Sequence, residues 1–244
     1  MTTHLLDIRH VNKHFGGNLA VSDVSFSVEK KQIFGLIGPN GAGKTTLFNC
    51  ITGYYPLTAG DIVFDNKKIN MLRPDQVCKL GMARTWQKVK PLGSLTTLEN
   101  IMTGAFSKTN SPRIARQIAL KHLETMGLAD YTDKSAAALS IGLKKKLELA
   151  RVLATDPKLL LLDEICGGLN HTETAAILEI IRMVRNNGIT IVFIEHDMKA
   201  VTSICDRIVV LNSGEKLAEG TPEEITSNPA VIAAYLGGGT NANH

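Results

Sequence analysis

The sequence predicts an α/β fold built on a largely parallel β-sheet. In the C-terminal half, short apolar runs at 158–163, 188–195 and 207–212 alternate with helical patterns at 171–186 and 197–205. Strands that are apolar throughout are typical of a parallel sheet covered by helices on both faces. Earlier in the chain, a glycine-rich turn joins another apolar run to a helix, which is a third sign of this fold class.

The N-terminal part is expected to be rich in strands. Short apolar and β-branched runs predict strands at 4–11, 19–28 and 31–37. A helix is expected from about Lys44 to Thr52, with Gly53 as a natural stop just past its end. A further strand or hairpin is expected at 61–70.

The middle of the chain has a different character. Between about residues 96 and 155 helical patterns dominate, as in the segment SPRIARQIALKHLETMGL, which has Pro112 near its start. A helical region therefore interrupts the strand-rich parts of the chain.

Composition excludes several classes of protein. With 44% hydrophobic and 20% charged residues among 244, the chain is expected to be globular. The net charge of +4 is too small to indicate nucleic-acid binding. No signal peptide is expected, and no apolar run approaches the roughly 20 residues of a membrane span. The cysteines are far apart, which argues against a zinc site or disulfides and fits a reducing compartment: Cys50, Cys78, Cys166 and Cys205.

A phosphate-binding motif follows the strand expected at 31–37. The segment GPNGAGKTT fits G-x-x-x-x-G-K-[ST] and lies between a strand and a helix, as the motif requires. Its glycines allow backbone N–H groups to converge on phosphate oxygens. Lys44 is expected to reach the β- and γ-phosphates, and Thr45 to ligate Mg²⁺. The candidate nucleotide-binding residues are Gly38, Pro39, Asn40, Gly41, Ala42, Gly43, Lys44, Thr45 and Thr46.

Two later strands end in polar residues. The run KLLLLDE ends in Asp163 and Glu164, and a buried strand rarely ends in two acids unless they face a cation. Asp163 suits the surroundings of Mg²⁺, and Glu164 is placed to polarise an attacking water as a general base. His196 follows another apolar strand, at the sheet edge where ligands bind in open α/β folds.

With these motifs in place, residues 4–236 resemble the ATP-binding subunit of an ABC transporter. Gln87 in ARTWQKVKP resembles the glutamine loop, which contacts Mg²⁺ and moves with the permease, and Phe15 resembles the aromatic that stacks on adenine. His196 resembles the switch histidine, a γ-phosphate contact. The segment GGLN at 167–170 occupies the place of the D-loop, and LSIGL at 139–143 that of the Leu-Ser-Gly-Gly-Gln signature.

The resemblance implies a P-loop NTPase with ABC-type architecture, in which antiparallel strands accompany the largely parallel core sheet. It implies one ATP-binding domain over residues 1–240, with a helical subdomain at about 93–155 inserted in the catalytic core. The expected activity is ATP hydrolysis with ATP and Mg²⁺, catalysed through Glu164, His196 and Gln87. The expected metal contacts are Thr45, Gln87 and Asp163.

The resemblance also implies partners. A second ATPase subunit, identical or a paralogue, is expected to sandwich ATP, with Ser140 and Gly142 facing its phosphate loop. Two transmembrane permeases and an extracytoplasmic solute-binding protein are expected, but no nucleic acid. The chain is therefore expected at the cytoplasmic face of the cell membrane, as a peripheral subunit. The segment KVKPLG at 88–93 is expected to line the groove that receives a permease helix.

The segment around the signature predicts a helix with one apolar face. Ser140 is a suitable N-cap, and Leu143, Leu147 and Ala150 share a face. The following lysines are expected on the solvated face, where Lys144 and Lys145 pair with Glu148. Gly142 is explained by close approach of a γ-phosphate.

Four residues depart from the family pattern, and the substrate class is left open. The departures are Ile141, Leu143, Ile165 and Asn170. Asn170 and the C-terminal segment resemble the branched-chain amino-acid transporter ATPases, which favours import of hydrophobic amino acids. Urea and short amides are alternative solutes. A soluble ABC ATPase acting as a mechanical clamp is a less favoured alternative, because the chain has neither a coiled-coil insertion nor a tandem ATPase domain. A P-loop small-molecule kinase or a GTPase is also disfavoured. The guanine-reading N-K-x-D is absent, and a kinase would leave His196 and the signature helix without a role.

Overall fold

The structure is a computed structural model that describes residues 4–87 and 90–236. Its elements up to residue 68 follow the predicted order, although the hairpin formed by residues 4–29 is longer than expected because the pairing continues to Phe15 opposite Asn18. The helix at 74–79 and the strand at 82–84 were not predicted. The first elements are β1 (His4–Phe15), β2 (Asn18–Glu29), β3 (Ile33–Ile37), α1 (Lys44–Ile51), β4 (Ala59–Phe64), β5 (Lys67–Lys68), α2 (Pro74–Lys79) and β6 (Met82–Arg84).

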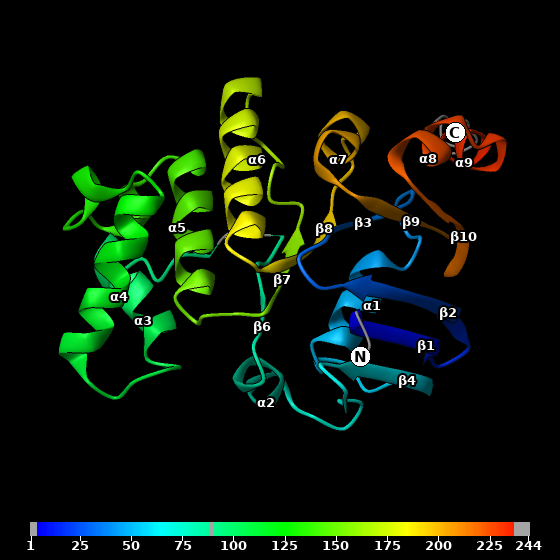
Figure 1. Ribbon diagram of the computed structural model, residues 1–244, viewed down its shortest axis with the longest axis horizontal. Coiled ribbons are helices and arrows are strands. Elements are labelled where there is room, and N and C mark those ends of the chain that lie inside the picture. Colours follow the sequence, from blue (N-terminus) through cyan, green and yellow to red (C-terminus); the bar gives the residue numbers. More distant parts are fainter. Residues whose placement is uncertain (1–3, 88–89, 237–244) are drawn as a thin grey trace.

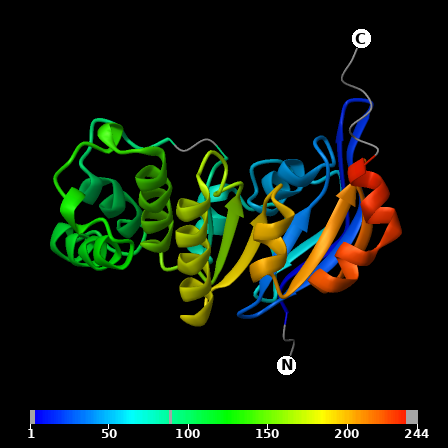
Figure 2. The same ribbon diagram turned by 90° about the horizontal axis from the view of Figure 1, so that it is seen from above.

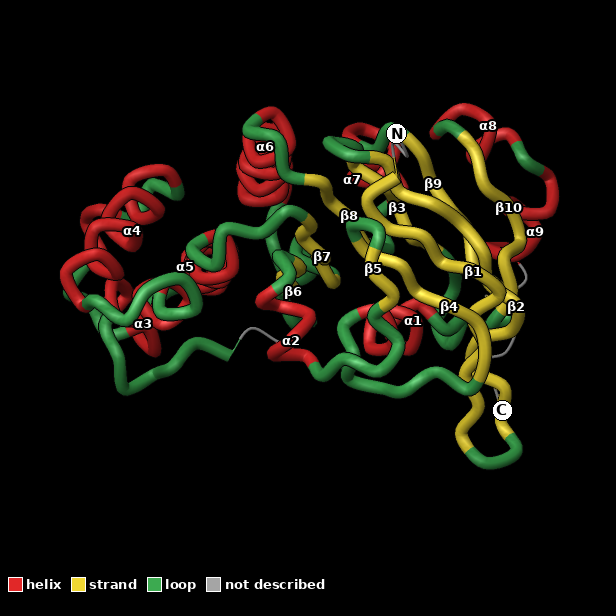
Figure 3. Tube along the Cα trace, turned by 60° about the horizontal axis from the view of Figure 1, so that its bottom comes forward, coloured by secondary structure: helices red, strands yellow, loops and turns green. Residues whose placement is uncertain are grey.

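A helical region lies at one end of the molecule (Figures 1 and 3). It contains α3 (Thr97–Ala105), α4 (Pro112–Thr125), the short 3₁₀ helices η1 (Ala129–Tyr131) and η2 (Ala136–Ala138), and α5 (Ile141–Leu153). Helices α3 and α5 pack closely because of Gly104: an added β carbon there would lie 2.0 Å from the carbonyl oxygen of Arg151. The helical character predicted for this stretch is confirmed.

The C-terminal part alternates strands and helices as predicted. Helix α6 (His171–Asn186) has the predicted bounds, and it begins where Asn170 and Glu173 form a capping box, in which each side chain accepts the other's backbone N–H. The elements are β7 (Leu159–Asp163), α6 (His171–Asn186), β8 (Thr190–Ile194), α7 (Met198–Ile204), β9 (Arg207–Asn212), β10 (Glu215–Gly220), α8 (Pro222–Ser227) and α9 (Pro229–Leu236).

The described strands form two sheets. The larger has the order β10-β9-β3-β8-β7-β6, in which every neighbouring pair is parallel except β10 with β9. The smaller is antiparallel, with the order β2-β1-β4-β5. Helices α6 and α7 cover one face of the larger sheet, while α1 and the smaller sheet lie on the other (Figures 1 and 2). The predicted α/β fold is confirmed.

Two apolar clusters hold these layers together. One lies between the two sheets around α1, with the rings of Phe26 and Phe34 stacked 5.2 Å apart between their centroids. The other continues from the helix-covered face of the larger sheet into the helical region. No helix in the described part of the chain is long and apolar enough to cross a bilayer.

Candidate functional site

A pocket of about 570 Å³ contains most of the predicted site residues. It lies where β3, β7 and β8 end, at the carboxyl edge of the parallel strands, which is the usual ligand site of such sheets. Its lining consists of Phe15, Asn18, Leu19, Ala20, Asn40, Gly41, Ala42, Gly43, Lys44, Thr45, Thr46, Gln87, Glu164, His196, Ser213 and Gly214.

The loop between β3 and α1 requires glycine at two positions. Gly38 and Gly43 have φ angles of 149° and 96°, which other residues rarely adopt. An added β carbon would lie 2.1 Å from the carbonyl oxygen of Leu211 at Gly38, and 2.5 Å from that of Ala20 at Gly43. The loop leads directly into α1, so the free N–H groups of that helix meet the loop and favour an anion there.

Lys44 lies inside this loop. Its Nζ donates to the carbonyl oxygens of Gly38 at 2.6 Å and Pro39 at 3.0 Å. Burial lowers the pKa of Lys44, and the carboxylates of Glu164 and Asp163 partly offset that effect. A buried cation beside free backbone N–H groups makes the loop a strong anion site.

Asp163, the last residue of β7, forms a buried ion pair that the sequence did not reveal. Arg84 at the end of β6 donates to its Oδ2 at 2.7 Å, and also to Oδ1 of Asn49 at 2.6 Å. The Oδ1 of Asp163 is buried without a hydrogen-bond partner. Burial raises the pKa of Asp163, and Arg84 works in the opposite direction. The unpartnered oxygen is an acceptor that a cation or a bound water would satisfy.

Gln87, Glu164 and His196, three predicted residues from distant parts of the chain, meet in the structure. The side-chain amide of Gln87 donates to Oε2 of Glu164 at 2.7 Å, and Nε2 of His196 lies 2.6 Å from Oε1 of the same carboxylate. Glu164 itself has a φ of 50°, and its backbone N–H donates to the carbonyl oxygen of Ile194 at 2.9 Å. The turn after β7 thus directs the carboxylate toward the residues that follow β6 and β8.

Phe15, the last residue of β1, lines the same pocket. Its half-exposed ring meets the edge of Tyr55 at 5.1 Å between centroids, and Nζ of Lys13 lies 4.8 Å from the ring centre. The ring has an accessible face on which a planar base can stack.

Ser140 and Gly142 do not join this pocket. They line a separate pocket of about 180 Å³ between the first turns of α5 and α6. Ser140 caps α5 as predicted, with its Oγ accepting the N–H of Leu143 at 3.4 Å. A β carbon added to Gly142 would lie 2.6 Å from Oε1 of Glu173. Packing against α6 within the same chain therefore also favours glycine at this position.

The expectation that the lysines of α5 face solvent is wrong for Lys145. Lys145 and Glu148 are each only 2% exposed. Nζ of Lys145 donates to the carbonyl oxygen of Glu164 at 2.9 Å, and Glu148 accepts the N–H of Trp86 at 2.8 Å. The turn after β7 and the segment after β6 cover this face of the helix, so the predicted pairing in water is replaced by bonds to buried backbone.

The expected permease-contact segment is partly described. Lys88 and Val89 lie outside the described residues, whereas Lys90 and Leu92 are exposed. Next to this segment, the exposed rings of Tyr54 and Trp86 meet edge to face at 6.0 Å between centroids. They line an apolar pocket of about 200 Å³ beside α2.

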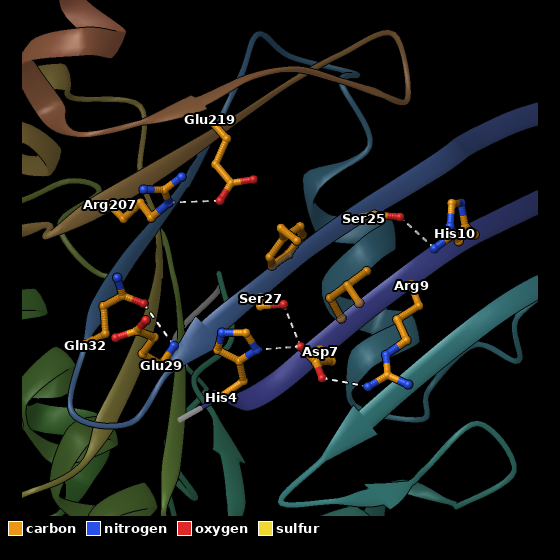
Figure 4. Close-up of a pocket in the computed structure, with 12 residues that line it drawn as sticks. His4, Asp7, Arg9, His10, Ser25, Ser27, Glu29, Gln32, Arg207 and Glu219 are labelled. Carbon is orange, nitrogen blue, oxygen red and sulfur yellow. Dashed lines mark hydrogen bonds and ion pairs between the residues drawn. The ribbon is translucent and has the colours of Figure 1, made fainter. Parts of the chain in front are cut away.

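Another pocket, of about 560 Å³, lies between β1–β2 and β9–β10 (Figure 4). Its charged groups bond to one another: Asp7 accepts from Arg9 at 2.8 Å, and Arg207 donates to Glu219 at 2.9 Å. None of the predicted site residues lines it, so it is distinct from the candidate nucleotide site.

Comparisons with known families agree with this geometry. Residues 21–167 match the family described as ABC transporter. Residues 215–240 match the family described as branched-chain amino acid ATP-binding cassette transporter.

The chain is similar to curated proteins over nearly their whole length. It is 44% identical to the high-affinity branched-chain amino acid transport ATP-binding protein LivG of Salmonella typhimurium, covering 97% of this chain and 99% of that protein. It is 41% identical to the corresponding protein BraF of Pseudomonas aeruginosa, with the same coverage.

Solved structures share the fold. A nucleotide-free ATP-binding cassette from an ABC transporter is 32% identical and superposes with a TM-score of 0.87, covering 95% of this chain and 98% of that chain. A dimeric structure of a bacterial ABC transporter cassette is 26% identical, with a TM-score of 0.81 over 89% of this chain and 98% of that chain.

Proposed function

The chain belongs to the family of ABC transporter ATP-binding proteins, and from that premise we propose that it hydrolyses ATP to drive the import of branched-chain amino acids. The end-to-end similarity to LivG and BraF carries this proposal. The match of residues 215–240 to the branched-chain family supports these amino acids over urea or short amides as the solute.

Different residues of the pocket contact different parts of ATP. Phe15 stacks on the adenine ring, and the loop from Gly38 to Thr46 surrounds the phosphates with backbone N–H groups. Lys44 supplies a positive charge to the β- and γ-phosphates. The support for these roles is that the ring, the loop and the lysine share one pocket.

The residues around Asp163 suit a magnesium ion. Hard cations of this kind prefer oxygen ligands, and the unpartnered Oδ1 of Asp163 lies at the end of β7, beside the pocket that Thr45 and Gln87 line. These three residues would hold Mg²⁺ directly or through water. When bound, the ion neutralises part of the phosphate charge.

Hydrolysis requires a group that accepts a proton from the attacking water. Glu164 is the general base, because its carboxylate lies at the pocket lining with a fixed orientation. Gln87 and His196 hold its two oxygens, and release of one of these bonds frees an oxygen for the water. His196 is then available to contact the γ-phosphate.

The functional unit contains two ATPase subunits. Ser140 and Gly142 of one subunit face the phosphate loop of the other, so that ATP lies between them. Their separation from the pocket of their own chain supports this arrangement, as does the dimer formed by a related cassette. The ATP-binding domain spans residues 1–240, with the helical subdomain inserted at about 93–155.

The remaining partners are two permease subunits and an extracytoplasmic solute-binding protein. The exposed aromatic surface formed by Tyr54 and Trp86, together with Leu92, is where a permease helix docks. Through this contact the chain is a peripheral subunit at the cytoplasmic face of the membrane.

Reconstitution with the permeases and solute-binding protein encoded by neighbouring genes tests the function. Leucine, isoleucine or valine is expected to stimulate ATP hydrolysis and to accumulate in vesicles, while urea and acetamide have no effect. A Lys44→Ala transporter is the inactive control. Stimulation by urea alone would overturn the solute assignment, and absence of ATP hydrolysis in every condition would overturn the activity.

A further inference from the structure

We propose that Lys145 is a positioning residue through which α5 couples the nucleotide at the partner's phosphate loop to Glu164 of its own chain. The inference rests on the proposed function, because it requires a dimer in which the first turn of α5 meets the partner's nucleotide. It adds a route between the two ATP sites that runs through one helix of each subunit.

A buried polar stripe runs along α5. Gly142, Lys145 and Glu148 are spaced three residues apart, so they share a face of the helix, and all three are buried. Charged groups are rarely buried unless they are paired or hydrogen-bonded, because desolvation is costly. Each charged member of this stripe therefore needs a specific partner: Lys145 bonds to the backbone of Glu164, and Glu148 to the backbone of Trp86, next to Gln87.

Lys145 fixes the turn that presents the general base. Its Nζ donates to the carbonyl oxygen of Glu164 at 2.9 Å, and the N–H of Gly167 donates to the same oxygen at 3.1 Å. With a φ of 50°, Glu164 has a backbone conformation that is uncommon outside glycine and needs support from its surroundings. Burial raises the pKa of both Glu148 and Glu195, and the charge of Lys145 acts in the opposite direction on each.

Glu148 holds the segment that contacts the side chain of Glu164. Its Oε1 accepts the N–H of Trp86 at 2.8 Å, and the next residue, Gln87, donates to Oε2 of Glu164 at 2.7 Å. One helix face therefore holds both the backbone of Glu164 and the segment that orients its carboxylate. A movement of α5 changes both contacts together.

The other end of the stripe lies where the partner's nucleotide is expected. Gly142 is in the first turn of α5, three residues before Lys145, which is about 4.5 Å along the helix axis. An α-helix moves as a rigid element over this length, so a shift of its first turn toward a bound phosphate also displaces the Lys145 ammonium. Occupancy of one ATP site thus sets the position of the base at the other, which makes hydrolysis cooperative in ATP.

The test uses the assembled transporter and three substitutions in one lysine run. Lys145→Met removes the donor while keeping length, Lys145→Arg keeps a donor and a charge, and Lys144→Met changes the half-buried neighbour as a matched control. For each, the rate of hydrolysis is measured against ATP concentration, and ATP affinity is measured on the isolated chain.

Lys145→Met is expected to lower kcat on the order of tenfold to hundredfold, as a misplaced base does. The Hill coefficient for ATP is expected to fall from above 1 to about 1, with ATP affinity of the isolated chain unchanged. Lys145→Arg is expected to restore most of the cooperativity, and Lys144→Met to behave as the wild type. A purely structural role would lower the yield or thermal stability without changing the Hill coefficient.

Several results would overturn the inference. These are a Hill coefficient of about 1 in the wild type, unchanged cooperativity in Lys145→Met, or the same loss in Lys144→Met. If Lys145→Met does not fold, Lys145→Gln replaces it, since the shorter amide does not reach the carbonyl, and retained cooperativity in that variant refutes the coupling. Failure of the proposed function is distinct, because the wild-type transporter would then show neither ATP hydrolysis nor uptake.

Discussion

Nε2 of His196 lies 2.6 Å from Oε1 of Glu164, while the amide of Gln87 donates to the other oxygen of the same carboxylate at 2.7 Å. The two partners follow different strands, β8 and β6, and the carboxylate follows β7 between them. A side chain held from both sides keeps its orientation before substrate arrives. This geometry supports the proposal that Glu164 is the general base, and we expect hydrolysis to depend strongly on its carboxylate.

Replacing that carboxylate is expected to stop the chemical step without preventing binding. In Glu164→Gln the amide cannot accept a proton from water, so turnover should fall by about 10²–10⁴-fold. ATP affinity should persist, and ATP-dependent dimers should accumulate in size-exclusion chromatography. Glu179→Gln, at an exposed position on α6, is the control. Near-normal turnover in Glu164→Gln would show that another group is the base.

Removal of the lysine in the phosphate loop is expected to affect binding itself. A charge-assisted contact contributes about 1.5–3 kcal/mol, so Lys44→Ala should weaken ATP binding about tenfold to hundredfold in calorimetry. The exposed Lys67→Ala on β5 should leave affinity unchanged. Equal affinities for wild type and Lys44→Ala would be incompatible with the assignment of the loop.

The segment after Gln87 is expected to touch a permease. Single cysteines at Lys90 or Leu92 should crosslink to a permease chain in the assembled transporter, because both positions are exposed. Three of the native cysteines are buried, so a Cys78→Ser background removes the partly exposed one. A cysteine at Lys67, which is exposed on the edge strand β5, provides the control. Crosslinks confined to the subunit itself would count against the proposed contact.

The burial of Glu148 predicts a pH dependence of stability. Burial raises its pKa, with the Trp86 N–H, Arg151 and Lys145 acting in the opposite direction, and its Oε2 has no partner. Below the ordinary pKa of 4.5 the carboxyl is protonated in both the folded and the unfolded state. As the pH rises from there through the folded pKa, the unfolded state loses its proton first, so the wild type loses stability.

The substitution Glu148→Gln removes this titrating carboxyl group. The free energy of unfolding of the variant, relative to the wild type, is therefore expected to rise as the pH increases from about 4.5 toward neutrality. Urea unfolding at a series of pH values measures the difference. A difference that stays constant, or that shrinks as the pH rises, would contradict the raised pKa.

Much of the fold was accessible from the sequence because its signals are local. The start of α6 follows from a capping box of neighbouring residues, and β9 is a single apolar run with the predicted bounds 207–212. The phosphate loop is also local, since one short segment supplies the glycines and Lys44. Signals of this kind can be read without knowing which distant segments pack against them.

What escaped prediction depends on contacts between distant segments. Lys145 and Glu148 form the pattern of a solvated ion pair, and only the covering of α5 by Glu164 and Trp86 buries them. The role of Arg84 was likewise missed, because its partner Asp163 lies 79 positions further along the chain. An arginine at the end of a short apolar strand was the one available hint.

Gly142 provides the last test, because the structure changes the prediction made from sequence. A side chain here meets the carboxylate of Glu173, which is the end of a flexible side chain that can move aside. Gly142→Ala should therefore fold and bind ATP as an isolated chain. It serves as the control for Gly142→Asp, which places a β carbon at the same point and adds a carboxylate beyond it.

Gly142→Asp is expected to leave the ATP affinity of the isolated chain almost intact, since Gly142 lies outside the pocket of its own phosphate loop. Dimer closure and hydrolysis should fail, because the new carboxylate would face the partner's γ-phosphate, where like charges in a poorly solvated site repel by several kcal/mol.

A mixing experiment distinguishes a homodimer from a pair of paralogues. In a homodimer, mixing Gly142→Asp with Lys44→Ala subunits places both substitutions in one of the two composite ATP sites and leaves the other site unchanged, so partial activity should return. With a paralogue as partner, no such rescue occurs. Loss of ATP affinity in isolated Gly142→Asp, with Gly142→Ala unaffected, would mean that α5 serves the nucleotide of its own chain, and the arrangement proposed for the dimer would be wrong.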